Sequence, residues 1–153
     1  MGFLSRLKSS LTGDWADVSL DVAPVQRGET AVVTVTVAVK TEPISINRVY
    51  VKLRCAEEIN IPNYPTGKRD AEGKSIDLNV RKTENLLNEE ITLADAQEFA
   101  AGSTRRFEGG LKIPAHLPAS FSGKYASIKW SVFAALDMKG NDPDSGWQEV
   151  SVP

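Results

Sequence analysis

Cysteine and histidine each occur once in this sequence of 153 residues. The lone cysteine, Cys55, excludes an intrachain disulfide and favours a reducing, cytoplasmic setting. The lone histidine, His116, has no Cys, His, Asp or Glu close to it at the spacing of metal ligands. The sequence therefore predicts no metal site, no cofactor and no histidine-based catalytic centre, and we do not expect an enzyme.

Long apolar runs and a surplus of positive charge are also missing. No apolar stretch is long enough to span a membrane, and the first residues lack the apolar segment of a signal peptide. The net charge of −2 argues against a nucleic-acid partner. A length of 153 residues and a hydrophobic content of 41% are those of one globular domain.

Alternation of apolar and polar residues is what the sequence has in abundance. From position 128 to position 136, apolar residues hold every second position. This period predicts a strand with one buried face. The same pattern predicts strands near residues 18–22, 31–40, 44–46, 49–55, 76–80, 91–93, 107–113 and 147–152. The expected core contains Val33, Val35, Val37, Val51, Leu53, Cys55, Ile128, Trp130, Val132, Leu136 and, in the last strand, Trp147.

Turn and break signals separate these strands. Residues 59–74 contain two prolines and two glycines, which predicts a long turn or a mobile hairpin tip. The apolar parity slips at Asn47-Arg48, which indicates a bulge or a bend between sheets. Gly109-Gly110 predicts a second bulge or bend, and residues 93–101 have room for a helical turn. This pattern predicts an all-β, antiparallel β-sandwich of the immunoglobulin-like type.

Residues 2–12 are the one segment with helical periodicity. The spacing predicts a short amphipathic helix, a separate unit over residues 1–13 that precedes the sandwich over residues 14–153. This helix either packs on its own domain or frays in solvent, or it docks to a protein partner or makes a weak peripheral contact with a membrane, and the sequence leaves these alternatives open. The candidate docking residues of this segment are Phe3, Leu4, Arg6, Leu7, Lys8 and Leu11.

A more specific pattern runs through the second half of the chain. Its parts, in order, are Gly102-Ser103, Phe107, Ile113-Pro114, LPASFSG at residues 117–123, and a strand with Trp130 that ends at Leu136-Asp137. This order resembles the second half of an arrestin N-terminal-type domain. The turn at Arg27-Gly28-Glu29 and the valine-rich strand after it resemble the first half. The start of the chain is similar to bacterial arrestin-like proteins of the sporulation-control type.

The resemblance implies an arrestin-like sandwich that acts as a non-catalytic adaptor or scaffold and binds a protein partner inside the cell. Most such relatives carry two sandwiches, whereas this sequence accounts for one. The alternative function is an immunoglobulin-like module that recognises carbohydrate or a surface component. That module would be expected to have exposed aromatic residues in a row.

Phe133 is the candidate binding residue within the sandwich. It lies on the same parity as Lys129 and Ser131, opposite to the apolar set of its strand. Either the second face of the sheet is covered at this point, or Phe133 belongs to an exposed apolar patch that binds something.

Overall fold

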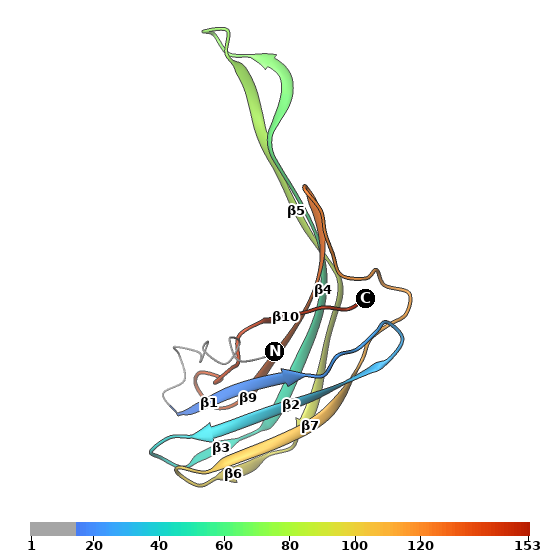
Figure 1. Cartoon of the computed structure of the whole chain (residues 1–153). Helices are drawn as coiled ribbons and strands as arrows, with labels where there is room; N and C mark the ends of the chain where they lie inside the picture. The colour runs from blue at the N-terminus through green and yellow to red at the C-terminus, as the bar shows by residue number, and fades with distance from the viewer. Residues whose placement is uncertain (1–14) are drawn as a thin grey trace.

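The computed structural model describes residues 15–153, which fold into two facing β-sheets with a small third sheet at one end (Figure 1). All strand pairs are antiparallel, which confirms the predicted all-β sandwich. Within the described range there is no helix, and so none that could cross a membrane. The strands are β1 (Ala16–Val22), β2 (Thr30–Val39), β3 (Ile44–Ile46), β4 (Arg48–Arg69), β5 (Ser75–Ala94), β6 (Gln97–Phe99), β7 (Thr104–Lys112), β8 (Phe121–Ser122), β9 (Ala126–Asp137) and β10 (Gln148–Val150).

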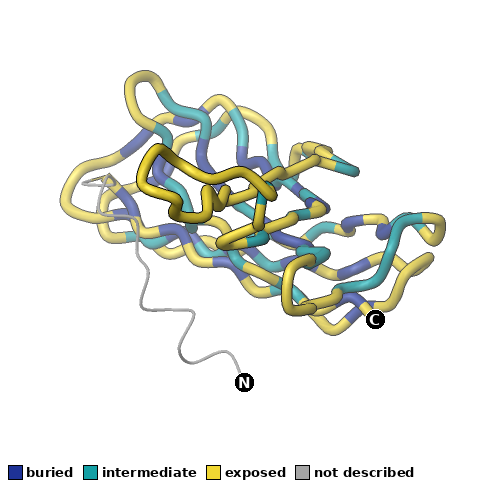
Figure 2. Tube along the Cα trace, turned by 90° about the horizontal axis from the view of Figure 1, so that it is seen from above, coloured by how far each residue is buried: buried dark blue, intermediate teal, exposed yellow. Residues whose placement is uncertain are grey.

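The core lies between the sheet β1-β2-β7 and the sheet β10-β9-β4-β5. Alternate residues of each strand point inward, so buried and exposed positions follow one another along the chain (Figure 2). The predicted core residues of β2 and β4 are fully buried. Ile128 is an exception, because it is half-buried where it pairs with the exposed Phe121 of the short strand β8.

The chain changes sheets at Asn47, as the parity slip predicted. β3 pairs with β6 in the small sheet, while β4 begins one residue after Asn47 and pairs with β5 and β9. The backbone N–H of Asn47 donates to the carbonyl oxygen of Asp137 at 2.8 Å. This hydrogen bond holds the bend against the end of β9.

The predicted helical turn over residues 93–101 is wrong. This segment contains the end of β5 and the strand β6, and Phe99 of β6 pairs with Ile44 of β3. Phe99 is almost fully buried. Strand pairing and burial of this ring outweigh a local helical preference, which is worth little over so few residues.

The predicted bulge at Gly109-Gly110 is also wrong. Gly109 pairs with Val33 and Gly110 with Val32 in an unbroken register between β7 and β2. A Cβ atom on Gly109 would collide with the side chain of Leu93, and one on Gly110 would lie 2.7 Å from Thr30 Cγ2. These glycines therefore allow close packing over a regular strand.

Residues 59–74 form much less of a turn than their prolines suggested. The β4–β5 ladder continues to the pair Arg69↔Ser75, and β5 is one continuous strand where two were expected. Register shifts between Ile61 and Tyr64 and between Pro65 and Arg69 accommodate the prolines. β9 pairs with β4 as far as Ile59↔Ala126. Residues 59–82, named here the ribbon, continue beyond it as a two-stranded arm that projects from the sandwich (Figure 1).

Trp130 is the largest fully buried side chain. Its indole Nε1–H donates to the carbonyl oxygen of Pro118 at 3.0 Å, which ties the loop before β8 to β9. We expect Trp130→Ala to lower the free energy of unfolding by about 3–5 kcal/mol, because it leaves a large cavity and an unpaired carbonyl. Urea unfolding measures this change. Trp15→Ala is the control, since Trp15 is 46% exposed and should tolerate truncation. Equal unfolding midpoints for both variants would contradict this account of the core.

Cys55 lies in the core with none of its surface exposed, which confirms its predicted burial. Burial raises the pKa of its thiol, because an apolar environment disfavours the thiolate. We expect the native protein to react very slowly with a thiol reagent. Val32→Cys, which places a second thiol at an exposed position of β2, should react fast in the same assay. Rapid loss of the native thiol would refute the assignment.

Candidate interaction surface

The outer face of the sheet β10-β9-β4-β5 carries a cluster of aromatic and cationic side chains. The odd residues of β4 from Val49 to Cys55 are buried in the core, so the even residues point to the opposite face. Phe133 of β9 stands opposite Lys52 in the register, and Trp147 precedes β10. The cluster, named here the aromatic–cation surface, consists of Arg48, Tyr50, Lys52, Arg54, Phe133 and Trp147.

Phe133 is at the centre of the three aromatic rings. Its ring centroid is 5.3 Å from that of Trp147 and 6.5 Å from that of Tyr50. Both contacts are tilted, within the range of favourable aromatic pairs. Phe133 is half-buried, because the buried Tyr50 and the exposed Trp147 pack against it and cover part of this face. That Phe133 binds something stays a prediction.

Trp147 was expected in the core, and that expectation is wrong. Its side chain is 41% exposed, because β10 begins one residue later and Trp147 packs on the outer face against Phe133. The guanidinium carbon of Arg54 lies 4.0 Å from the centroid of the indole ring. This is cation–π geometry, which orders both side chains where they meet solvent.

The other two cations of the surface, Arg48 and Lys52, differ in their neighbours: Arg48 contacts carboxylates, whereas Lys52 lies near aromatic rings. Arg48 donates to Glu90 at 2.8 Å and to Asp137 at 3.5 Å. The hydrogen bond that Arg48 donates to Glu90 is the main reason that the pKa of Arg48 is raised. Lys52 lies 5.7 Å from the ring centroids of both Tyr50 and Phe133.

Neither Lys52 nor Arg54 has a carboxylate within ion-pair distance among residues 15–153. The surface therefore carries two positive charges that the described part of the chain does not neutralise. Both charges lie directly against aromatic rings.

Tyr50 anchors the loop that presents Trp147. Its hydroxyl donates to Asp142 Oδ2 at 2.9 Å, and the other oxygen of Asp142 accepts from the backbone N–H of Met138 at 3.1 Å. Burial, followed by the hydrogen bond to Asp142, raises the pKa of Tyr50 well above its ordinary value. Tyr50 thus ties the loop of residues 138–146 to the sheet through Asp142, while the second oxygen of Asp142 accepts a hydrogen bond from within the loop.

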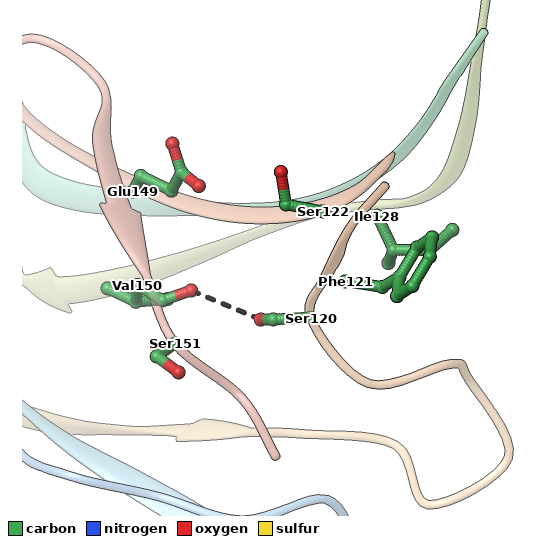
Figure 3. Close-up of a pocket in the computed structure, with 7 residues that line it drawn as sticks. All are labelled: Ser120, Phe121, Ser122, Ile128, Glu149, Val150 and Ser151. Atoms are coloured by element: carbon green, nitrogen blue, oxygen red, sulfur yellow. Dashed lines mark hydrogen bonds between the residues drawn. The ribbon is translucent and has the colours of Figure 1, made fainter. Parts of the chain in front are cut away.

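A separate hollow lies at one end of the sandwich, between β8 and β10 (Figure 3). It has a volume of about 420 Å³. The hydroxyl of Ser120 is already engaged, since it donates to Val150 O at 3.5 Å and accepts from the Val152 N–H at 2.8 Å. Glu149 is the one charged residue in the lining. This hollow therefore offers no pair of groups for acid–base chemistry.

Of the candidate docking residues found in the sequence, only Phe133 lies within the described part of the chain. Phe133 lies in the aromatic–cation surface, and the exposed His116 lies away from any cluster of metal-binding type among residues 15–153. The sequence analysis did not identify Arg48, Tyr50, Lys52 and Arg54 as members of a surface, and it assigned Trp147 to the core. The alternation Arg48-x-Tyr50-x-Lys52-x-Arg54 was a usable signal for the β4 part of the surface. The other candidates, Phe3, Leu4, Arg6, Leu7, Lys8 and Leu11, lie outside the described residues.

Comparison with known proteins identifies the fold. A model of the arrestin (or S-antigen) N-terminal domain matches residues 24–152, which is most of the chain. The chain belongs to the arrestin family. The match confirms the resemblance seen in the LPASFSG segment and in the strand with Trp130. No curated protein sequence matches the chain.

A solved arrestin-like structure of similar fold is that of Spo0M, the sporulation control protein from Bacillus subtilis. It aligns with a TM-score of 0.61 and 18% sequence identity, over 90% of this chain and 49% of that chain. This arrestin-like chain thus spans about half the length of Spo0M. At this identity the likeness establishes the fold.

Tyr50→Phe tests whether the hydroxyl holds the loop. We expect the variant to be less stable at neutral pH by about 1.5 kcal/mol, the value of a hydrogen bond to a charged acceptor. The folded-state pKa of Tyr50 is raised above the ordinary value of 10.0, so this stability is complete below pH 10 and is lost as the pH rises further.

Urea unfolding at increasing pH measures the effect. The difference between the parent chain and Tyr50→Phe should shrink above pH 10, because ionisation of Tyr50 in the unfolded parent chain favours unfolding. Tyr64→Phe, at an exposed position of the ribbon, is the matched control. A difference that stays constant with pH would contradict the role given to this hydroxyl.

Proposed function

We propose that this arrestin-family domain is a non-catalytic adaptor that binds a protein partner through the aromatic–cation surface. The observation that carries the proposal is Trp147, exposed yet ordered between the guanidinium of Arg54 and the ring of Phe133. Tryptophan, tyrosine and arginine are the residues that contribute most to protein–protein binding. Ordered aromatic side chains also lose little conformational entropy on binding.

The charge of this surface indicates the chemistry of the partner. Lys52 and Arg54 are positive and have no carboxylate partner among the described residues, whereas Arg48 is held by Glu90 and Asp137. A partner segment that combines acidic and apolar side chains would neutralise Lys52 and Arg54 and pack on Trp147. Desolvated charge pairs of this kind determine specificity and dissociation rate.

A carbohydrate-binding module is the second candidate, because Tyr50, Phe133 and Trp147 form a group of neighbouring rings. A sugar ring stacks on an open aromatic face. The Arg54 guanidinium lies over Trp147, and Lys52 lies over both Tyr50 and Phe133. These contacts favour the protein partner.

The proposed adaptor works without catalysis and in the cytoplasm. The single thiol, Cys55, is free and buried, which suits a reducing compartment but does not require one. The segment of residues 2–12 remains, from its sequence, a candidate for docking to the same partner or for a weak contact with a membrane.

The test compares co-purification from the native cell with the parent chain, Trp147→Ala and Trp15→Ala as baits. Both tryptophans are more than 40% exposed, but Trp15 does not belong to the aromatic–cation surface. We expect Trp147→Ala to weaken capture of the partner by more than about tenfold, the scale of a central aromatic at an interface. Trp15→Ala should leave capture unchanged.

Equal capture by the two variants would refute the surface as the binding site. Titration with soluble oligosaccharides, followed by tryptophan fluorescence, separates the second candidate. A saturable fluorescence change that is lost in Trp147→Ala would favour the carbohydrate module over the adaptor.

A further inference from the structure

The ribbon has one face made of apolar side chains that meet solvent. Figure 2 looks along this arm and shows it as almost entirely exposed. Ile61 of β4 pairs with Val80 of β5, and Tyr64 pairs with Leu78, so each pair stands on one face. Leu78 is 54% exposed. The apolar face consists of Ile59, Ile61, Tyr64, Ile76, Leu78 and Val80.

This face continues the inner face of the sandwich. β4 alternates without a break from Leu53 and Cys55, which are buried in the core, to Ile59 and Ile61 in the ribbon. Within the sandwich the sheet β1-β2-β7 covers that face, and on the ribbon no described residue replaces it (Figure 1). The apolar face therefore has the character of a sandwich interior that lacks its second layer.

Opposite charges stand at the two ends of the apolar face. Glu57 and Glu84 are directly opposed in the register at the base of the ribbon, and both are exposed. Neither has an ion-pair partner among residues 15–153. Lys68 and Lys74 lie near the tip, and Lys74 directly precedes β5 in the turn. Lys82, which pairs with Ile59, stands on the same face between Glu84 and Val80. From the base to the tip, the face thus carries Glu84 and Lys82, then the apolar residues, and then Lys74 just beyond the strand.

We propose that the apolar face of the ribbon packs against the same face of a second copy of this chain, antiparallel and around a two-fold axis. The two ends of the segment 74–84 carry opposite charges and lie symmetrically about Asn79. A two-fold axis at Asn79 places Val80 of one copy opposite the partner copy's position 78, and Glu84 opposite its position 74. Glu84 then meets the partner copy's lysine, and apolar side chains meet each other.

Such a pairing supplies the missing second layer and neutralises the Glu84 carboxylate of each copy. Lys82 stands opposite position 76 in this arrangement, where its aliphatic stem packs on isoleucine while its ammonium stays in water. The inference rests on the ribbon alone and does not depend on the proposed function, which concerns the outer face of the sandwich.

Sedimentation velocity over a wide concentration series tests the proposal. We expect the parent chain to dimerise with increasing concentration and Leu78→Asn to weaken dimerisation by more than about tenfold, because two leucines leave the interface. Val32→Asn is the matched control, since Val32 is 51% exposed on β2, outside the ribbon. At concentrations where all three chains are monomeric, they should show similar thermal unfolding.

Charge reversal gives the sharper test. Glu84→Lys alone and Lys74→Glu alone each place like charges opposite one another, and each should self-associate about tenfold more weakly than the parent chain. A mixture of the two variants restores both contacts, since each copy then offers the charge that the other needs. We expect the mixture to form heterodimers at concentrations where either variant alone is monomeric.

Three results would overturn the proposal. The first is a parent chain that stays monomeric at every concentration, and the second is a mixture that associates no better than its components. The third is a monomeric chain that co-sediments with phosphatidylcholine–phosphatidylglycerol vesicles and loses this binding in Leu78→Asn. That result would assign the apolar face to a lipid surface.

Discussion

Burial of alternate side chains between two sheets is the constraint on which the rest of this structure depends. The inner residues of β2 and β4 are fully removed from solvent, and Trp130 fills the space between the layers. Because Trp130 also donates to Pro118 O, the same side chain fixes the loop that leads to β8. Loss of this packing would destabilise the sheet that carries both proposed binding surfaces, because protein interiors are close-packed.

β4 connects the core to both surfaces. Its odd positions from Val49 to Cys55 form the core, and its even positions from Arg48 to Arg54 form one row of the aromatic–cation surface. The same strand then leaves the sandwich and carries the inner, apolar face into the ribbon. The two surfaces therefore lie on opposite faces of one sheet. The two proposals therefore use different side chains, and a partner on the outer face would not compete for the residues of the ribbon.

The sequence predicted the parts of the fold that depend on local periodicity. Period-two alternation identified the strands of the core, the parity slip located the change of sheet at Asn47, and the position of Cys55 among inward residues predicted its burial. These predictions succeeded because a strand with one buried face repeats every two residues whatever its partner is. The LPASFSG motif further indicated the arrestin family, which the match over residues 24–152 confirms.

Tertiary structure alone decided the features that depend on what lies across the sheet. Pairing of Phe99 with Ile44 makes residues 97–99 a strand. The side chain of Leu93 leaves no room for a Cβ atom at position 109, which explains the glycine there. Neither contact is local in sequence. Trp147 and Phe133 meet because β9 and the residue before β10 are adjacent in space. The ribbon stays solvent-exposed because the opposing sheet ends before it does. Alternation in a sequence marks a face as apolar, but the layer that covers that face comes from elsewhere in the chain or from another molecule.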